Sequence, residues 1–203
     1  TVAVPDAAET LSLTGLDLYQ QGIQPIWMRI ENTGKTRVRA AFRSIDPNYF
    51  SPIEVAYMNR KGFSKQAYSD MEAWFHRNAM QRHIDPGETR SGLVFTNRKP
   101  VNKAFHLDIF KGTDAAHFTF FVPIPGFTAI HQRVDFDNLY RDSEIRKLDE
   151  LQLKSVLENE LQCCSENGRT GEANGLPLNL VLVGSKLAVR SSLLRGGWIE
   201  GSA

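Results

Sequence analysis

The histidines of this chain are the residues most suited to binding a metal ion. His76 and His83 are seven residues apart, whereas two metal ligands on one helix are more often four residues apart. The remaining histidines are scattered along the sequence at His106, His117 and His131. Neither cysteine belongs to a Cys-x-x-Cys pair. We therefore expect no metal site and interpret the histidines as solvent-facing side chains.

The two cysteines, Cys163 and Cys164, are adjacent. Neighbouring Cα atoms lie about 3.8 Å apart, less than the roughly 4.4–6.8 Å common in disulfides. The spacing favours two reduced thiols, with a bond between them as the alternative, and the pair is a candidate redox site. A nucleophilic thiolate needs electropositive surroundings, whereas Glu160 and Glu166 lie nearby in the sequence. We assign no catalytic residue.

Gly184-Ser185-Lys186 follows an apolar run, where a phosphate-binding loop would lie. A Walker loop requires Gly-x-x-x-x-Gly-Lys-Ser/Thr, but position 179 is Asn and the order here is Gly-Ser-Lys. The dinucleotide-binding pattern is also incomplete. We interpret the motif as an ordinary turn between a strand and a helix, and expect no cofactor.

Two aromatic clusters remain, Asp46-Pro47-Asn48-Tyr49-Phe50 and Trp74-Phe75-His76. Because aromatic residues contribute strongly to binding energy at interfaces, we take five of these residues as a candidate binding surface: Asp46, Tyr49, Phe50, Trp74 and His76. In the alternative interpretation, the aromatic side chains cover the hydrophobic core.

The composition limits the classes of partner. A net charge of +1 over 203 residues gives no electrostatic signal for nucleic acid and no polybasic face for anionic lipid. The sequence has no apolar run of 18 residues, so we expect no membrane span. The length suffices for one large core with a smaller appendage.

Residues 22–42 show the clearest β pattern. Ile26, Met28 and Ile30 alternate with polar or larger residues, and so do the apolar residues of 38–42. With Asn32-Thr33-Gly34 as a three-residue loop, a hairpin would pair Met28 with Val38. It would also place Arg29 opposite Arg37, which is unfavourable. The alternative is a corner between two packed sheets.

The sequence predicts several further elements. Leu16–Tyr19 resembles a first strand, and Ser51-Pro52-Ile53-Glu54 predicts a short helix to about Asn59. After a loop at 61–67, Ser69-Asp70-Met71-Glu72 predicts a second helix ending near His83. Strands are expected at 92–96 and in a hairpin with a four-residue loop at 112–115, which would pair Phe105 with Val122.

The last third has a different pattern. Residues from Asp149 predict a helix with Gln152 as the capping partner. Leu178–Gly184 is a nearly continuous apolar run, typical of a strand buried on both faces. Ser185 then predicts the start of a helix ending at Gly196-Gly197. The strand and helix form half of a βαβ unit. Either the strand docks on an edge of the sandwich or the natural protein continues beyond Ala203, and we favour the second.

Residues 139–198 resemble the beginning of the LssY carboxy-terminal-like module of bacteria. The resemblance rests on Leu139-Tyr140, the helix with Leu151 and Leu157, Cys163-Cys164, Gly168, Gly171, Pro177–Gly184 and Gly197-Trp198. It implies a bacterial, extracytoplasmic setting in the periplasm or anchored to the envelope, as in a lipoprotein, and assigns no catalytic residue. Gln162 departs from the proline expected before the cysteine pair. The first 125 residues share only Asn-Thr-Gly and Pro-Gly-Glu-Thr with bacterial immunoglobulin-like envelope domains.

The sequence thus predicts a mainly β fold with α. An antiparallel, immunoglobulin-like β-sandwich at 1–125 carries a helical insertion at about 51–84, and a small α/β segment follows at 126–203. We expect a non-enzymatic binding or scaffold module. Its partner would be a protein or an envelope component, further sequence of the same protein, or a second copy in a homo-oligomer. The alternative is a hydrolase-like or lipid-related enzyme with its site in the α/β segment.

Overall fold

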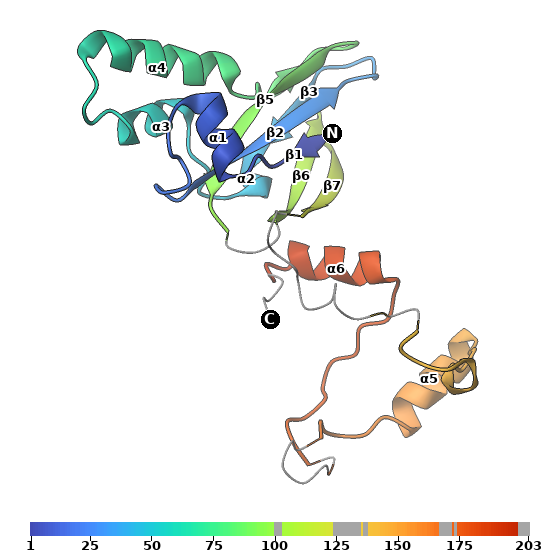
Figure 1. The fold of residues 1–203 in the computed structure, drawn as a ribbon. Coiled ribbons are helices and arrows are strands. Elements are labelled where there is room, and N and C mark those ends of the chain that lie inside the picture. Colours follow the sequence, from blue (N-terminus) through green and yellow to red (C-terminus); the bar gives the residue numbers. More distant parts are fainter. Residues whose placement is uncertain (100–102, 124–134, 136–137, 167–171, 173, 199–203) are drawn as a thin grey trace. The chain divides into compact units, whose positions relative to one another are not determined.

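The computed structural model describes residues 1–99, 103–123, 135, 138–166, 172 and 174–198 (Figure 1). The chain divides into two compact units. The first comprises residues 1–130 and 191–203, and the second comprises residues 131–190. Among the described residues, none of the helices has both the length and the apolar character that crossing a bilayer requires.

The first unit contains most of the regular structure. Its elements in chain order are β1 (Val2–Ala3), α1 (Ala7–Thr14), β2 (Ile23–Glu31), β3 (Val38–Ala41), α2 (Phe42–Ile45), α3 (Pro52–Met58), α4 (Lys65–Asn78), β4 (His83–Ile84), β5 (Thr89–Asn97), β6 (Lys103–Lys111) and β7 (Asp114–Val122). The second unit contains a 3-10 helix (Asp142–Glu144) and α5 (Glu150–Asn159). The last helix, α6 (Lys186–Arg195), begins within the second range of residues and ends within the first.

The strands form two antiparallel sheets, with the orders β1-β2-β5 and β4-β3-β6-β7. One hydrophobic cluster joins the two sheets. It includes Ile26 and Met28 from β2, Val94 from β5, and Phe105 and Leu107 from β6. The inward positions that the alternation predicts for Ile26 and Met28 are confirmed, since both side chains are fully buried. The fold is therefore mixed α and β, built on two antiparallel sheets.

The β2–β3 segment is a corner between the sheets, as the alternative interpretation predicted, and the hairpin prediction is wrong. Met28 lies opposite Gly92 of β5 and Val2 of β1, whereas β3 pairs with β4 and β6. The corner relieves the repulsion that a hairpin would create, because Arg37 instead forms an ion pair with Asp85.

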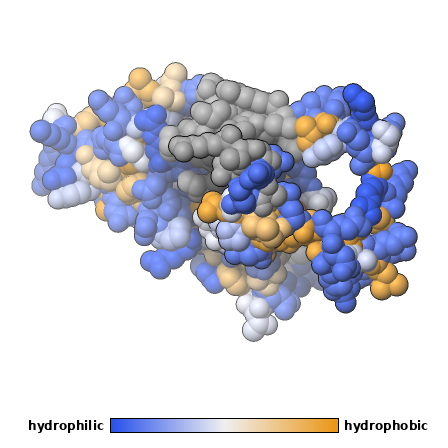
Figure 2. All heavy atoms as spheres, turned by 90° about the horizontal axis from the view of Figure 1, so that it is seen from below, coloured by the Kyte–Doolittle hydropathy of each residue, from blue (hydrophilic) through white to orange (hydrophobic). Residues whose placement is uncertain are grey.

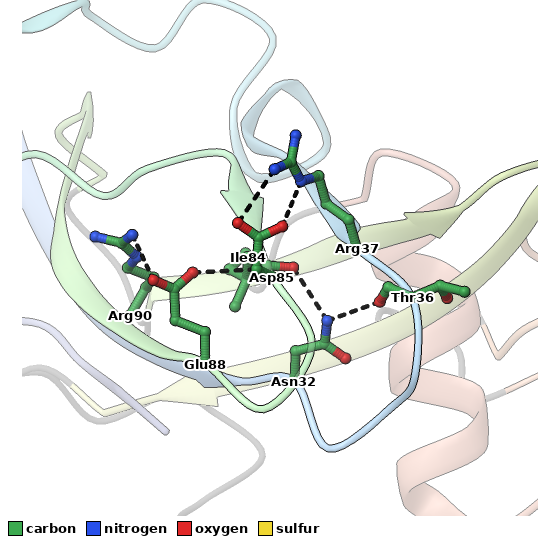
Figure 3. A network of polar contacts seen from close by, with 7 residues as sticks. All are labelled: Asn32, Thr36, Arg37, Ile84, Asp85, Glu88 and Arg90. Atoms are coloured by element: carbon green, nitrogen blue, oxygen red, sulfur yellow. Dashed lines mark hydrogen bonds and ion pairs between the residues drawn. The ribbon is translucent and has the colours of Figure 1, made fainter.

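Asn32 holds the corner in place (Figure 3). Its side-chain amide donates hydrogen bonds to the carbonyl oxygens of Thr36 at 2.8 Å and Ile84 at 3.0 Å. Beside it, the backbone N–H of Asp85 donates to the Glu88 carboxylate, which also pairs with Arg90. The corner is thus attached by side-chain and backbone hydrogen bonds to the turn between β4 and β5.

The predicted second hairpin exists as β6–β7, but its register is two residues away from the predicted one. Phe105 lies opposite Phe120 rather than Val122, and Lys111 lies opposite Asp114. The loop is therefore the two residues Gly112 and Thr113 instead of four. Gly112 has a φ of 59°, which suits the first loop position of a two-residue hairpin turn. A shift of two residues keeps each side chain on its predicted face.

The helices of the first unit differ in how well the sequence predicts them. Ser51 caps α3 and forms the predicted capping box with Glu54. Ser64, rather than Ser69, caps α4, which ends at Asn78 instead of near His83. Residues 1–15 contain β1 and α1, and Leu16–Tyr19 forms no strand. The earlier start of α4 brings Tyr68 into the helix, where it packs against the core.

The outer face of β2 and β5 is also buried. Leu93 and Phe95 of β5 belong to a second cluster with Val55 of α3 and Phe75 of α4. Helices α3 and α4 therefore cover the face of this sheet opposite to the first cluster (Figure 1). This cover explains why β5 is buried at five consecutive positions.

Replacing Gly92 with alanine is expected to lower the free energy of unfolding by about 2–3 kcal/mol. A Cβ at this position would lie 2.6 Å from the backbone nitrogen of Met80, and that nitrogen is held by its hydrogen bond to the Leu93 carbonyl. Urea denaturation measures the loss. Gly184→Ala is a matched control, because its Cβ would meet only side-chain atoms at 3.4 Å or more. Equal stability of Gly92→Ala and the parent protein would contradict this packing.

The C-terminal helices match the sequence, but the predicted strand between them does not. Asp149 and Gln152 form the expected capping box of α5. The Ser185 hydroxyl accepts a hydrogen bond from the backbone N–H of Ala188 at 3.2 Å, and α6 ends before Gly196-Gly197. Leu178–Gly184 forms no strand, and its apolar side chains are exposed. The predicted loop at 165–175 lies partly outside the described residues.

Candidate functional site

A small hollow lies beside the segment that joins α2 to α3. Its volume is about 120 Å³. Tyr49, Phe50, Ser51 and Pro52 line one side, and Leu93, Val94 and Phe95 of β5 line another; the remaining lining residues are Phe42, Ala79, Met80 and Arg82. Two of the five predicted binding residues, Tyr49 and Phe50, are therefore brought together here.

The backbone fixes both aromatic residues. The backbone N–H of Phe50 donates to the Phe95 carbonyl at 2.8 Å, which attaches the segment to the edge of β5. The Tyr49 backbone N–H donates to the Asp46 carbonyl at 3.2 Å. The Tyr49 ring packs edge-to-face on Phe42 with the centroids 6.1 Å apart. Tyr49 is thus held at the opening by its own turn and by the core beneath it.

Arg82 supplies the charge at this hollow, and the sequence did not identify it. Its guanidinium donates a hydrogen bond to the Tyr49 hydroxyl and lies 5.9 Å from the ring centroid. Its backbone carbonyl accepts from the Ala40 N–H at 2.8 Å. Among the described residues, no carboxylate pairs with Arg82, whose side chain is exposed. The predicted helix extended through Arg82, which concealed its position beside Tyr49.

Asp46 does not lie on the binding surface, contrary to the sequence interpretation. It is buried, and its carboxylate accepts hydrogen bonds from the Asn97 backbone N–H at 2.7 Å, the Asn97 side-chain amide at 2.9 Å and the Asn48 backbone N–H at 3.0 Å. The Lys103 ammonium, also buried, donates to the Asn97 carbonyl at 2.7 Å. This cluster anchors the segment that carries Tyr49 to the end of β5, so Asp46 positions the site from within.

The two charges of this cluster have shifted pKa values. Burial opposes ionisation of Asp46, but the hydrogen bonds from Asn97 and Asn48 outweigh it and hold its pKa below the ordinary value. Burial, with the nearby charge of Lys99, lowers the pKa of Lys103 to about 8, against the opposing effect of Asp46. The charged ammonium of Lys103 therefore destabilises the folded state, and its deprotonation at alkaline pH removes this destabilisation.

Between about pH 8 and 10.5, the free energy of unfolding of the parent protein should rise relative to that of Lys103→Met. In this interval the unfolded lysine binds more protons than the folded one, so the free energy of unfolding increases with pH. Below pH 8 both states are protonated and the cost is fully present. The gain is expected to be about 2–3 kcal/mol, from about 1.4 kcal/mol per pKa unit. Urea denaturation across this range tests it, and a difference that does not change with pH would contradict it.

The other predicted residues lie apart from the hollow's lining. Trp74 is half-buried, packs against the second core cluster and contacts Phe75 edge-to-face at 5.2 Å. It therefore behaves as the core alternative predicted. His76 is exposed on α4. Among the residues that the structure describes, no group of three histidine, cysteine, aspartate or glutamate side chains is arranged to hold a metal ion.

Cys163 and Cys164 are joined by a disulfide in the second unit, whereas the sequence favoured two free thiols. The bond closes a ring between neighbouring residues, which was the alternative interpretation. Around it, the Cys163 carbonyl accepts a hydrogen bond from the Leu178 N–H at 2.8 Å, and the Ser165 N–H donates to the Leu176 carbonyl at 2.9 Å. Two short strand-like segments therefore hold the disulfide in place.

No protein-family model, no curated protein and no solved structure matches this chain.

Proposed function

We propose that this protein is a non-enzymatic binding module that receives one apolar side chain of a partner protein in the hollow beside Tyr49, Phe50 and Arg82. The observation that carries the proposal is an apolar hollow of about 120 Å³ beside a guanidinium that has no carboxylate partner among the described residues. The sequence led to the same class of function through Tyr49 and Phe50. The structure adds Arg82, whose guanidinium donates a hydrogen bond to the Tyr49 hydroxyl.

The size of the hollow favours a side chain over a metabolite. Pockets for small molecules have volumes of about 300–1,000 Å³, whereas an engineered apolar cavity of about 150 Å³ holds a benzene ring. A hollow of about 120 Å³ therefore accepts a group the size of a leucine side chain. The half-buried Phe50, Pro52 and Ala79 provide apolar surface, and the buried Met80, Val94 and Phe95 also line the hollow.

The charge beside the hollow selects the group next to that side chain. The exposed Arg82 guanidinium is oriented by the Tyr49 hydroxyl and ring, and guanidinium groups bind carboxylates through paired hydrogen bonds. The preferred partner segment thus has an apolar residue next to an aspartate, a glutamate or a C-terminal carboxylate.

We also propose a bacterial, extracytoplasmic setting, from the resemblance of residues 139–198 to the LssY carboxy-terminal-like module. The Cys163–Cys164 disulfide supports this setting, because disulfides persist in oxidising compartments. The two antiparallel sheets support a further proposal, that the first unit is a variant of the immunoglobulin-like sandwich.

Peptide selection tests the binding proposal. A random peptide library displayed on phage is selected on the parent protein, on Arg82→Glu and on Arg29→Glu. The parent is expected to enrich an apolar residue next to an acidic one, and Arg82→Glu should enrich a basic residue there instead. Arg29 is an exposed arginine of β2 outside the hollow, so its reversal should leave the selected motif unchanged. Motifs that are identical for the parent and Arg82→Glu would refute the proposal.

A further inference from the structure

The loop between α3 and α4 concentrates positive charge. From Val55 to Ser69 the sequence contains no acidic residue, but it contains Arg60, Lys61 and Lys65. All three are exposed. The net charge of +1 for the whole chain did not indicate this basic cluster, because acidic residues elsewhere in the sequence cancel its charge in the total. We call residues 57–68 the α3–α4 tip.

Apolar side chains are exposed between these charges. Tyr57, Met58 and Phe63 are exposed by 55%, 39% and 46%. Met58 and Phe63 line an open hollow of about 550 Å³, together with Arg60, Lys61, Ser64, Lys65 and Tyr68. On the side where α3 and α4 lie, Figure 2 shows hydrophobic and hydrophilic residues intermixed.

The tip is ordered by its own contacts. The Phe63 N–H donates to the Arg60 carbonyl at 3.2 Å, and Gly62 has a φ of 90°, the arrangement of a type II turn. The Arg60 guanidinium lies 3.5 Å from the Tyr57 ring centroid and donates to the Tyr57 carbonyl at 2.7 Å. Phe63 is therefore held in an exposed position, so that little conformational entropy is lost when it binds.

We propose that the α3–α4 tip docks on the surface of an anionic phospholipid bilayer. Phe63 and Met58 enter the boundary between headgroups and acyl chains, while Lys61, Lys65 and Arg60 contact lipid phosphates. Charge complementarity favours this partner, since Lys61 and Lys65 form no ion pair among the described residues. A bilayer presents many phosphates in a plane, so the basic residues need no fixed spacing to contact them. The bilayer interface also accepts the apolar side chains, whereas a nucleic acid backbone offers them no apolar surroundings.

Vesicle co-sedimentation of the full chain tests the proposal. The vesicles consist of phosphatidylcholine alone or of equal parts of phosphatidylcholine and phosphatidylglycerol. The protein is expected to bind only the anionic vesicles, and to dissociate near 1 M salt, where the Debye length is about 3 Å. Each basic residue near an anionic surface strengthens binding by about fivefold. Lys61→Gln/Lys65→Gln should therefore weaken it by about 25-fold.

Two further variants separate charge from insertion. Phe63→Ala should weaken binding by about tenfold at unchanged charge. Lys35→Gln/Lys111→Gln removes two exposed lysines outside the tip and should bind like the parent. The proposal is overturned if the parent binds both kinds of vesicle equally, or if the two double variants bind alike. It is also overturned if the parent binds a double-stranded oligonucleotide or heparin but neither vesicle.

Discussion

Replacing Asp46 with alanine is expected to lower the free energy of unfolding by about 3–5 kcal/mol. The substitution removes the acceptor of three hydrogen bonds and leaves the buried Lys103 ammonium without its counter-charge. The N–H groups that lose their acceptor and the ammonium that loses its counter-charge together account for the loss. Urea denaturation at neutral pH measures it.

Asp17 provides the matched control for this prediction. Its carboxylate accepts one hydrogen bond, from the Gln20 N–H at 3.0 Å, and its side chain is exposed. Asp17→Ala should therefore change stability by less than about 1 kcal/mol. If Asp46→Ala proves as mild as Asp17→Ala, the segment that carries Tyr49 is not anchored by this cluster.

The second large effect is expected at Phe75, where alanine should lower the free energy of unfolding by about 3–5 kcal/mol. The Phe75 side chain is 1% exposed, and its ring centroid lies 5.3 Å from that of Phe95. Its removal leaves a cavity between α4 and the outer face of β5. Thermal and urea denaturation both report this loss.

Phe63→Ala serves as the comparison, because Phe63 is exposed in the α3–α4 tip. It should change stability by no more than about 0.5 kcal/mol. A much larger loss for Phe75→Ala than for Phe63→Ala would show that α4 covers the outer face of β5 and does not merely lie beside it. Comparable small losses for both would contradict the covered outer face.

The alternation of β2 predicted the inward side chains but not the layer outside them. Ile26 and Met28 are buried as expected, and so is Leu93 on the outer face of the neighbouring strand β5. A period of two residues indicates one buried face. It cannot show that Val55 and Phe75, far away in the sequence, cover the other face. This information exists only in tertiary packing.

Local patterns also failed where two of them competed. The segments on either side of Asn32 match a hairpin, yet Asn32 bonds to the Ile84 carbonyl and turns the chain into the other sheet. Ser64 and Ser69 both resemble helix caps, and the start at Ser64 adds to the helix Tyr68, which packs against the second cluster. In each case long-range contacts decided between acceptable local structures.

The candidate site was only half predictable. Tyr49 and Phe50 were identified from their aromatic character, but Asp46 was misread because a buried carboxylate and a surface one look alike in sequence. Arg82 joins Tyr49 only through the chain that runs from α4 into β4, since its carbonyl bonds to Ala40 of β3. No pattern in the sequence indicates this contact between residues 33 positions apart.

In the function that we propose, the hollow beside Tyr49 and Arg82 binds an apolar side chain next to a carboxylate. An NMR titration of the full chain with N-acetyl-leucine, recorded on backbone amides, tests it most directly. Saturable shifts are expected at Phe50, Val94 and Phe95, with a Kd of about 1–10 mM for a ligand of this size. N-acetyl-leucinamide, which lacks the carboxylate, should bind several-fold more weakly, and Arg82→Gln should remove that difference. The absence of saturable shifts at the hollow, or equal binding of both ligands to the parent protein, would contradict the account.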